Sequence, residues 1–281
     1  MTSNELDSSS EDLFDAESLE TVGWRQCVCL PDEFVTKLQR DELLPTLDSG
    51  GSWVVLTQSC DLLNKSLGEE PRVEVILAEH RSKKLNQGKK HGNDARELHL
   101  RDATSEQKLG FHSKNRHCFP RELLMGFRPD AVIGDKETRR ELVRWISRKY
   151  ERAAFADAFN RRWFGIRKEW SKAVEKSDGD LYAIYVDVSS EELVGDTPYR
   201  INVYCVASME ATEDDRIFHA TDALAETFGQ LMDACDGIEV QECHLVTMAE
   251  LSLEDIHRLQ RFDFDAITIK GDGVDAAPRD G

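Results

Sequence analysis

The amino-acid sequence predicts an α+β protein. A small mixed or antiparallel β unit with two basic amphipathic helices comes first, and a second α+β unit of sheet and helix follows. Three observations support this class: short apolar runs separated by turn residues in the first third, two long helical patterns in the middle, and alternating strand and helix patterns in the last third. With 281 residues, 40% of them hydrophobic, the chain can bury two modest cores.

Composition divides the chain into four parts. Residues 1–21 are rich in Ser, Asp and Glu and predict a disordered acidic tail, and residues 272–281 predict a second disordered tail. Residues 22–177 are expected to hold the β unit and the basic helices. Residues 178–271 are expected to form an α+β domain, because the turn signal from Ser177 to Asp180 separates two different patterns.

The first part is expected to hold a short, antiparallel sheet. Residues 24–30 alternate in polarity and suit a first strand, and residues 32–43 have helical spacing after Pro31. Residues 81–94 carry five basic groups among Gly and Asn and predict a loop. Further strands are predicted at 53–58, 72–79 and 97–100.

Two helices are expected to carry most of the basic charge. Asp135 can cap the first, in which Leu142, Trp145 and Ile146 form an apolar stripe. The second has an apolar stripe over residues 155–173. Basic residues lie on other faces of both helices, so each can pack on the sheet and expose a cationic surface. An ordinary solvated face, partly paired with acidic residues of the same helices, is the alternative.

The second part alternates strand and helix patterns. It contains no phosphate loop, no dinucleotide fingerprint and no internal repeat. Its predicted elements, in chain order, are strands at 181–188 and 199–207 that form a hairpin, a helix at 220–235 closed by Gly237, a strand at 238–246, a short helix near 253–259 and a strand at 264–269.

Charge is segregated along the chain. Residues 81–176 hold 25 Lys and Arg against 13 Asp and Glu, a net charge of +12, whereas the remainder carries −30 of the total −18. Such a basic segment either meets an external polyanion or is neutralised by acidic parts of the same chain or of a protein partner. No apolar run approaches the roughly 18 residues that span a membrane, so we expect a cytoplasmic protein without membrane contact.

The segment Trp53–Leu62 is an apolar strand that ends on polar and reactive side chains. Cys60 is a candidate nucleophile, with Asp61 and Gln58 as further catalytic candidates. Its general base would be one of the nearby histidines, which are His80, His99, His112 and His117. Alternatively, Cys60 is a small buried residue, and Ser59 or Asp61 caps a short helix. The enzymatic class therefore stays open, with a Cys60-dependent hydrolase or toxin as one hypothesis.

The spacing of metal ligands does not match a known site. The seven cysteines include only Cys-X-Cys and Cys-His neighbours, which argues against a zinc knuckle and favours reduced thiols. A nuclease carboxylate motif after Asp61 would need Glu, one residue and Lys, and Glu74-Val75-Ile76 lacks the lysine. A metal-free ribonuclease on a small barrel stays open. We therefore predict no metal and no cofactor.

A nucleic-acid interface is the leading hypothesis for the basic helices. Arginine binds phosphates through paired hydrogen bonds, and an aromatic neighbour can stack on a base. In the alternative, Tyr150 completes the buried stripe and Arg152 pairs with Asp157. The predicted contact residues are Arg140, Arg144, Arg148, Tyr150, Arg152, Arg161, Arg162 and Lys168.

Two segments resemble paired landmarks of an uncharacterised bacterial family. They are Val54–Leu62, with the sequence VVLTQSCDL, and Trp145–Phe159, which opens with Trp-Ile-Ser-Arg-Lys-Tyr-Glu-Arg. Members of that family are often encoded near mobile elements and phage-defence genes. The resemblance covers under a tenth of the chain and implies no known activity. The resemblance implies a cellular setting more than a chemistry. Together with the basic segment and the helix faces, it leads us to expect a nucleic-acid-interacting component of such a system, with a protein-interaction subunit as the alternative.

Overall fold

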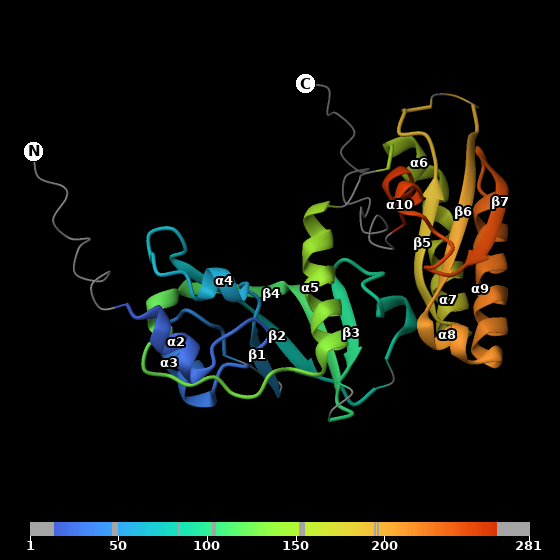
Figure 1. Cartoon of the computed structure of the whole chain (residues 1–281). Coiled ribbons are helices and arrows are strands. Elements are labelled where there is room, and N and C mark those ends of the chain that lie inside the picture. The colour runs from blue at the N-terminus through green and yellow to red at the C-terminus, as the bar shows by residue number, and fades with distance from the viewer. Residues whose placement is uncertain are drawn as a thin grey trace, which may run out of the picture. The chain divides into compact units, whose positions relative to one another are not determined.

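The computed structural model describes residues 14–46, 50–83, 85–102, 105–151, 155–193, 195 and 197–262. The chain forms two compact units (Figure 1). Unit 1 comprises the described residues up to 83 together with 96–144, and unit 2 comprises 85–95 together with 145–262. Each unit pairs a four-stranded sheet with helices, which confirms the predicted α+β class.

The sheet of unit 1 is antiparallel throughout. Its strands are β1 (Gly51–Val55), β2 (Arg72–His80), β3 (Glu97–Arg101) and β4 (Lys108–Pro120), in the spatial order β1-β2-β4-β3. Alternate β2 residues Val73, Val75 and Leu77 face a core that also contains Phe34 and Phe119. The predicted strands at 72–79 and 97–100 are thus confirmed in position, and the strand predicted at 53–58 is found two residues earlier and ends at Val55. The sequence analysis missed β4.

Short helices cover the core side of this sheet. They are α2 (Ala16–Val22), α3 (Asp32–Arg40), α4 (Ser59–Leu62) and the 3-10 turn η2 (Arg121–Leu124). Helix α2 corrects the predicted tail over residues 1–21. Asp15 caps it through Glu17 N and Ser18 N, and Leu19 is 1% exposed in the core. Residues 1–13 of that tail, and all of the predicted tail at 272–281, lie outside the described residues.

Residues 27–30 pair with β1 at the edge of the sheet of unit 1 without forming a regular strand. Cys27 N donates to Val55 O and Leu30 N donates to Trp53 O, so the segment runs beside β1. On its other side, Cys29 N donates to Ala131 O and Ile133 N donates to Cys27 O. The predicted strand at 24–30 is therefore an irregular segment held between β1 and residues 130–133.

Helix α5 (Lys136–Glu151) begins directly after that segment, and the two units divide within it, between Arg144 and Trp145. The predicted boundary at residue 177 is therefore wrong. The second basic helix is interrupted, as α6 (Asp157–Trp163), the 3-10 turn η3 (Phe164–Ile166) and α7 (Arg167–Lys176). Gly165, a poor helix former, lies in that turn. These helices belong to unit 2 and not, as predicted, to the first part of the chain.

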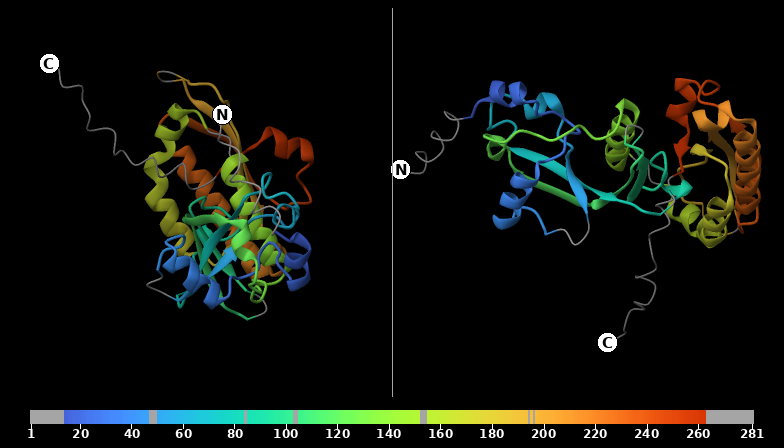
Figure 2. Two further views of the ribbon diagram at one scale, coloured as in Figure 1. Left: turned by 90° about the vertical axis from the view of Figure 1, so that its left-hand side faces the viewer. Right: turned by 90° about the horizontal axis from the view of Figure 1, so that it is seen from below.

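The sheet of unit 2 is mixed. Its strands are β5 (Leu181–Asp187), β6 (Tyr199–Ala207), β7 (Ile238–Val246) and β8 (Gln260–Arg261), in the order β7-β6-β5-β8. The predicted β5–β6 hairpin is confirmed as an antiparallel pair, while β7 is parallel to β6. Such a parallel pair needs a helical crossover, supplied here by α8 (Met209–Glu213) and α9 (Asp215–Asp233). Figure 2 shows α9 running alongside this sheet.

One core fills the helical side of this sheet. The ring centroid of Phe262 lies 4.6 Å from that of Trp163 and 5.2 Å from that of Phe228. Trp170 packs edge-on against Phe228. The short helix α10 (Leu253–Arg258) matches the helix expected near 253–259. The predicted strand at 264–269 lies outside the described residues. Among the helices described, none has the length and apolarity to cross a membrane.

The predicted loop at 81–94 contributes its second half to unit 2. It contains the 3-10 turn η1 (Gln87–Lys89), and the side chain of Asn93 donates to Leu181 O. Asp180 is 2% exposed, and its carboxylate lies 3.1 Å from His91 Nε2 and 3.2 Å from Lys90 Nζ. Ser208 Oγ donates to the same carboxylate at 2.9 Å. This buried polar cluster holds residues 85–95 against the rest of unit 2.

Replacing Asp180 with Asn is expected to remove an acid-sensitive part of the stability of unit 2. Burial opposes ionisation, but His91, Lys90 and Ser208 outweigh it and hold the pKa of Asp180 well below its usual range. Stability from this carboxylate is therefore fully present above the unfolded-state pKa of about 4, declines as pH falls below it, and is lost completely only below the lowered pKa of the folded state. In urea titrations, D180N should lose about 2 kcal/mol at pH 7 and a smaller amount at pH 3.

Asp222→Asn is the matched control, because Asp222 is an exposed aspartate on α9. It should leave the urea midpoint unchanged at both pH values. Equal losses for D180N at pH 7 and at pH 3 would contradict the proposed electrostatic contribution.

Replacing Arg121 is expected to destabilise unit 1. This side chain is 0% exposed, and its guanidinium donates to Asp61 O, Leu62 O and Ser66 O at 2.6 to 3.1 Å. Lysine keeps the charge but not the fork of donors, so R121K should lower the free energy of unfolding by about 3 kcal/mol. Arg128→Lys, at an exposed site, is the control. Urea unfolding with equal midpoints for both variants would contradict the expected anchoring role.

Candidate functional site

The turn after β1 presents an exposed thiol. Cys60 Sγ lies 3.2 Å from Asp61 Oδ1 and 3.6 Å from Gln58 Oε1, within the first turn of α4. The hydrogen bond to Asp61 raises the pKa of the Cys60 thiol, with smaller contributions from burial and from the charge of Asp61. The thiol is therefore protonated at neutral pH, which is the opposite of what a cysteine nucleophile needs.

The alternative interpretation of this turn needs correction on two points. Cys60 is exposed, so it is not the buried packing residue of the alternative interpretation. Gln58 occupies the N-cap of α4 and makes no capping hydrogen bond, while Ser59 Oγ accepts from Gln26 N at 3.1 Å. Neither Ser59 nor Asp61 caps the helix. The Ser59 hydroxyl instead connects α4 to the segment that contains Gln26.

The histidines proposed as bases have other surroundings. His99 is 2% exposed, and its Nε2 lies 3.0 Å from Glu97 Oε1. His117 packs edge-on against Trp53 at 5.2 Å, and His112 Nδ1 accepts from Lys114 N. His80 ends β2 at an exposed position. The described contacts of Cys60 are thus to carboxylate and amide oxygens, which do not support the hydrolase hypothesis.

Slow alkylation of Cys60 at neutral pH is expected. An exposed thiol with a raised pKa holds little thiolate, so iodoacetamide should modify it more slowly than it modifies glutathione at pH 7.5. Asp61→Asn should speed the reaction severalfold by removing the carboxylate. Peptide mass spectrometry can follow Cys60 alone among the seven cysteines. Alkylation of the wild type faster than glutathione would revive the nucleophile hypothesis.

A hollow of ≈ 420 Å³ lies between this turn and the first half of α5. Its lining brings together two sets of residues that the sequence predicted separately, the strand-end turn and the basic helix. Ser59 comes from the turn, and Arg140 and Arg144 come from the helix. The full lining is Gln26, Cys27, Ser59, Lys136, Arg139, Arg140, Val143 and Arg144.

The positive charge of the hollow exceeds its acidic partners. Arg140 pairs with Glu137 at 3.3 Å, in a contact that leaves both side chains more than half exposed. Arg139 Nη1 donates to Gly134 O at 2.7 Å, and neither Arg139 nor Lys136 forms an ion pair with a carboxylate among the described residues. The carboxylate of Asp135 adds a negative charge nearby: it accepts from Thr138 N, and this hydrogen bond and, to a smaller extent, the charge of Arg139 lower the pKa of Asp135.

The wall opposite the helix is held rigidly. Gln26 Nε2 donates to Leu56 O at 2.6 Å, and Gln26 N donates to Ser59 Oγ. Cys27 has a φ of 66°, a left-handed conformation that costs a non-glycine residue energy and that its backbone hydrogen bonds maintain. Burial raises the pKa of the Cys27 thiol to about 11, and Arg139 counteracts this only in part. Cys27 therefore contributes a neutral, weakly polar surface.

Among these lining residues, the sequence analysis predicted only Arg140 and Arg144 as contact residues. Lys136 precedes Arg140 and Arg144 by one and two intervals of four, so helical spacing alone could have added it to the predicted set. Arg139 lies one position from that row. No local signal identifies Gln26, because only the fold brings it to the turn after β1.

Two predicted contact residues have structural roles in unit 2. Arg162 Nη1 donates to Thr197 O and Gly237 O, each at 2.7 Å, and its guanidinium lies over the Tyr199 ring. Arg148 Nη1 donates to His91 O at 2.7 Å. Backbone carbonyls of their own chain thus accept from these donors, and neither residue lines the hollow of unit 1.

The remaining predicted residues are exposed or not described. Arg161 and Lys168 are exposed on α6 and α7, and Tyr150 is 73% exposed, so it does not complete the buried stripe. Arg152, with its suggested pairing to Asp157, lies outside the described residues. Arg161, Lys168 and Tyr150 belong to unit 2 and do not line the hollow of unit 1.

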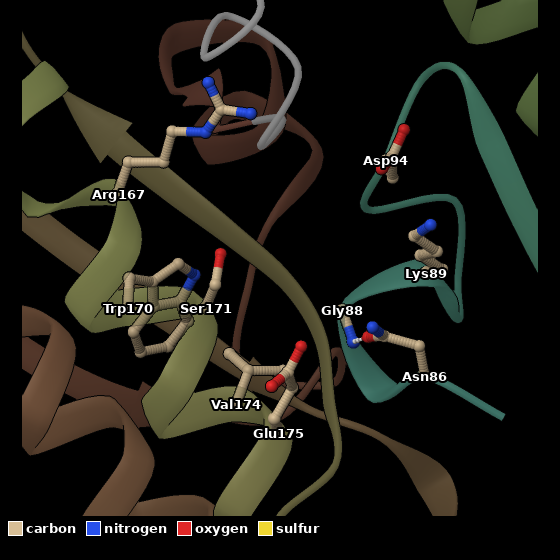
Figure 3. A pocket seen from close by; sticks show the side chains of 9 residues that line it. All are labelled: Asn86, Gly88, Lys89, Asp94, Arg167, Trp170, Ser171, Val174 and Glu175. Atoms are coloured by element: carbon tan, nitrogen blue, oxygen red, sulfur yellow. Dashed lines mark hydrogen bonds between the residues drawn. The ribbon is translucent and has the colours of Figure 1, made fainter. Parts of the chain in front are cut away.

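Unit 2 has a hollow of its own, of ≈ 340 Å³ (Figure 3). Helix α7 faces the segment 85–95 across it. Lys89 and Arg167 supply positive charge, and Asp94 and Glu175 supply negative charge. Because the charges balance, this hollow offers a polyanion no general attraction. The other lining residues are Asn86, Gly88, Trp170, Ser171 and Val174.

In the part of the chain that the structure describes, no three His, Cys, Asp or Glu side chains gather in a way that could hold a metal ion.

Comparisons with known proteins give no information on the function of the chain. No protein-family model matches the sequence, and no curated protein and no solved structure matches it either. The case for a function therefore depends on the hollow of unit 1.

Proposed function

We propose that this protein binds nucleic acid through its phosphates at the cationic hollow of unit 1. One observation carries the proposal: Lys136, Arg139, Arg140 and Arg144 line a single hollow, and two of them have no carboxylate partner among the described residues. Arginine and lysine supply most phosphate contacts in nucleic-acid complexes, and they release counterions on binding.

The spacing of these cations suits a strand backbone. Lys136 and Arg144 are eight residues apart on α5, which corresponds to roughly 12 Å along the helix axis. Successive phosphates of one B-form strand advance by roughly 3.4 Å along the duplex axis, so three to four of them match this length. Arg140 and Arg144 are exposed at the rim and are the residues assigned to internal phosphates.

Two further parts of the hypothesis depend on sequence alone. The resemblance of Val54–Leu62 and Trp145–Phe159 to a family encoded near phage-defence and mobile-element genes supplies the proposed cellular setting. An acidic protein partner is the rival ligand, since carboxylates also pair with arginine. Phosphate contacts and carboxylate contacts are both salt-sensitive, so only direct binding to nucleic acid separates the two hypotheses.

Binding of labelled single- and double-stranded DNA and RNA across a salt series tests the proposal. The wild type should bind at low salt, and the logarithm of affinity should fall linearly with the logarithm of salt concentration. The double variant R140Q/R144Q should bind more weakly and reduce that slope by about 2, because each lost phosphate contact contributes about 0.9.

The matched control is R161Q/K168Q, which removes the same charge from exposed positions of unit 2. It should bind like the wild type. Absence of binding at low salt to all four nucleic acids would overturn the proposal and turn the search to a protein partner. Equal weakening in both double variants would show a general charge effect and contradict a site at the hollow.

A further inference from the structure

The floor and the rim of the cationic hollow differ in chemistry. Arg140 and Arg144 are exposed, whereas Arg139 is half-buried and is fixed by its hydrogen bond to Gly134 O. The exposed Lys136 and the side chains of Ser59 and Gln26 line the same hollow as Arg139, and we call these four residues its floor. Internal phosphates of a strand can reach the rim, formed by Arg140 and Arg144, without entering the hollow. The floor can therefore take a ligand of its own.

Resting on the proposed function, we propose that the floor of the hollow takes a phosphate monoester, the group that a nucleic-acid strand carries at a phosphorylated end. Lys136 and Arg139 would bind the phosphate oxygens, and the Ser59 hydroxyl would donate to them. Arg140 and Arg144 would hold the phosphodiesters that follow.

Size supports a terminal group. The hollow measures ≈ 420 Å³, within the range of about 300 to 1,000 Å³ that is usual for small-molecule sites. A duplex, whose major groove alone is about 12 Å wide, is too large to enter it. A single nucleotide at the end of a strand can enter.

Charge supports a monoester over a diester. A phosphate monoester carries about −1.5 to −2 charges at neutral pH and three terminal oxygens, whereas a backbone diester carries a single charge. Lys136 and Arg139 form no ion pair with a carboxylate among the described residues, and together with Arg140 they outnumber the nearby carboxylates of Asp135 and Glu137, which suits the higher charge. Arg139 is already oriented by Gly134 O, so its binding geometry costs little additional ordering.

The opposite wall offers matching polar groups. Ser59 Oγ accepts from Gln26 N, and its hydroxyl hydrogen has no acceptor among the described residues. Gln26 uses its Nε2 on Leu56 O, and this bond leaves the amide oxygen for a sugar hydroxyl or a base amino group. Cys27 and Val143 provide the less polar surface that a sugar or a base covers.

The experiment compares one labelled oligonucleotide in three forms, with a 5′-phosphate, with a 3′-phosphate and with hydroxyls at both ends, by fluorescence anisotropy on the full chain. One phosphorylated form should bind roughly tenfold more tightly than the hydroxyl form, which corresponds to the gain of about one or two charge-assisted hydrogen bonds. K136Q and R139Q should each reduce this preference severalfold while keeping most of the affinity for the hydroxyl form.

Controls separate recognition from folding. Lys136 is exposed, so K136Q tests the floor without a buried change. R139K keeps the charge and should keep part of the preference, and the urea midpoint of each variant shows whether it is folded. R161Q/K168Q should retain the full preference. Competition by a nucleoside monophosphate at similar affinity would identify a free nucleotide as the ligand source, and failure to compete would identify the strand end.

Binding to the end of a strand and binding to its backbone are distinguished by different results. Equal binding of all three oligonucleotide forms, with binding lost in R140Q/R144Q, would overturn the phosphate-monoester inference and leave nucleic-acid binding intact. No binding of any form at low salt would overturn both. A preference that persists in both K136Q and R139Q would place end recognition elsewhere and overturn the inference.

Discussion

Backbone pairing of residues 27–30 is the constraint on which the candidate site depends. On one side these residues hydrogen-bond to β1, and on the other to residues 130–133. Because 130–133 lead through Gly134 directly into α5, this pairing fixes the first turns of the helix beside the end of β1. Segments about 80 residues apart in sequence thereby supply the two walls of one hollow. The left-handed backbone of Cys27 occurs inside this pairing, where strain can be maintained by its surroundings.

Hydrophobic patterns in the sequence revealed only the strands and helices whose own residues alternate between buried and exposed positions or form an apolar run. Apolar runs mark β1 and β2, and the predicted ranges of β6 and β7 coincide with the observed strands. Strand β4 escaped because His112 to Cys118 is mostly polar, with only Ser113 buried. It is stable because it pairs with β2 on one side and β3 on the other, and backbone pairing of this kind leaves no trace in a hydrophobic pattern. The same limitation hid the membership of residues 85–95 in unit 2, which depends on Asp180 about 90 residues away.

The basic residues show why composition identifies a site only in part. Helical spacing grouped Arg140 and Arg144 correctly with one face of α5, and both line the hollow. The same reasoning selected Arg148 and Arg162, whose guanidinium groups bind carbonyls of unit 2. A guanidinium has five donors and takes any nearby acceptor, so loops with exposed carbonyls recruit arginine for structure. Only tertiary contacts distinguish these two uses, and no local sequence signal marks Gln26.

The total charge of −18 does not decide whether a polyanion can bind. At physiological ionic strength the Debye length is about 8 Å, so carboxylates beyond that distance contribute little to the potential within the hollow. The local set consists of Lys136, Arg139, Arg140 and Arg144 with the carboxylates of Glu137 and Asp135 beside them, so these cations outnumber the two anions. Concave, low-dielectric walls strengthen the field of such a set. Distant acidic groups act mainly on approach, where they repel weakly and non-specifically, and bound phosphates are held by the cations within reach.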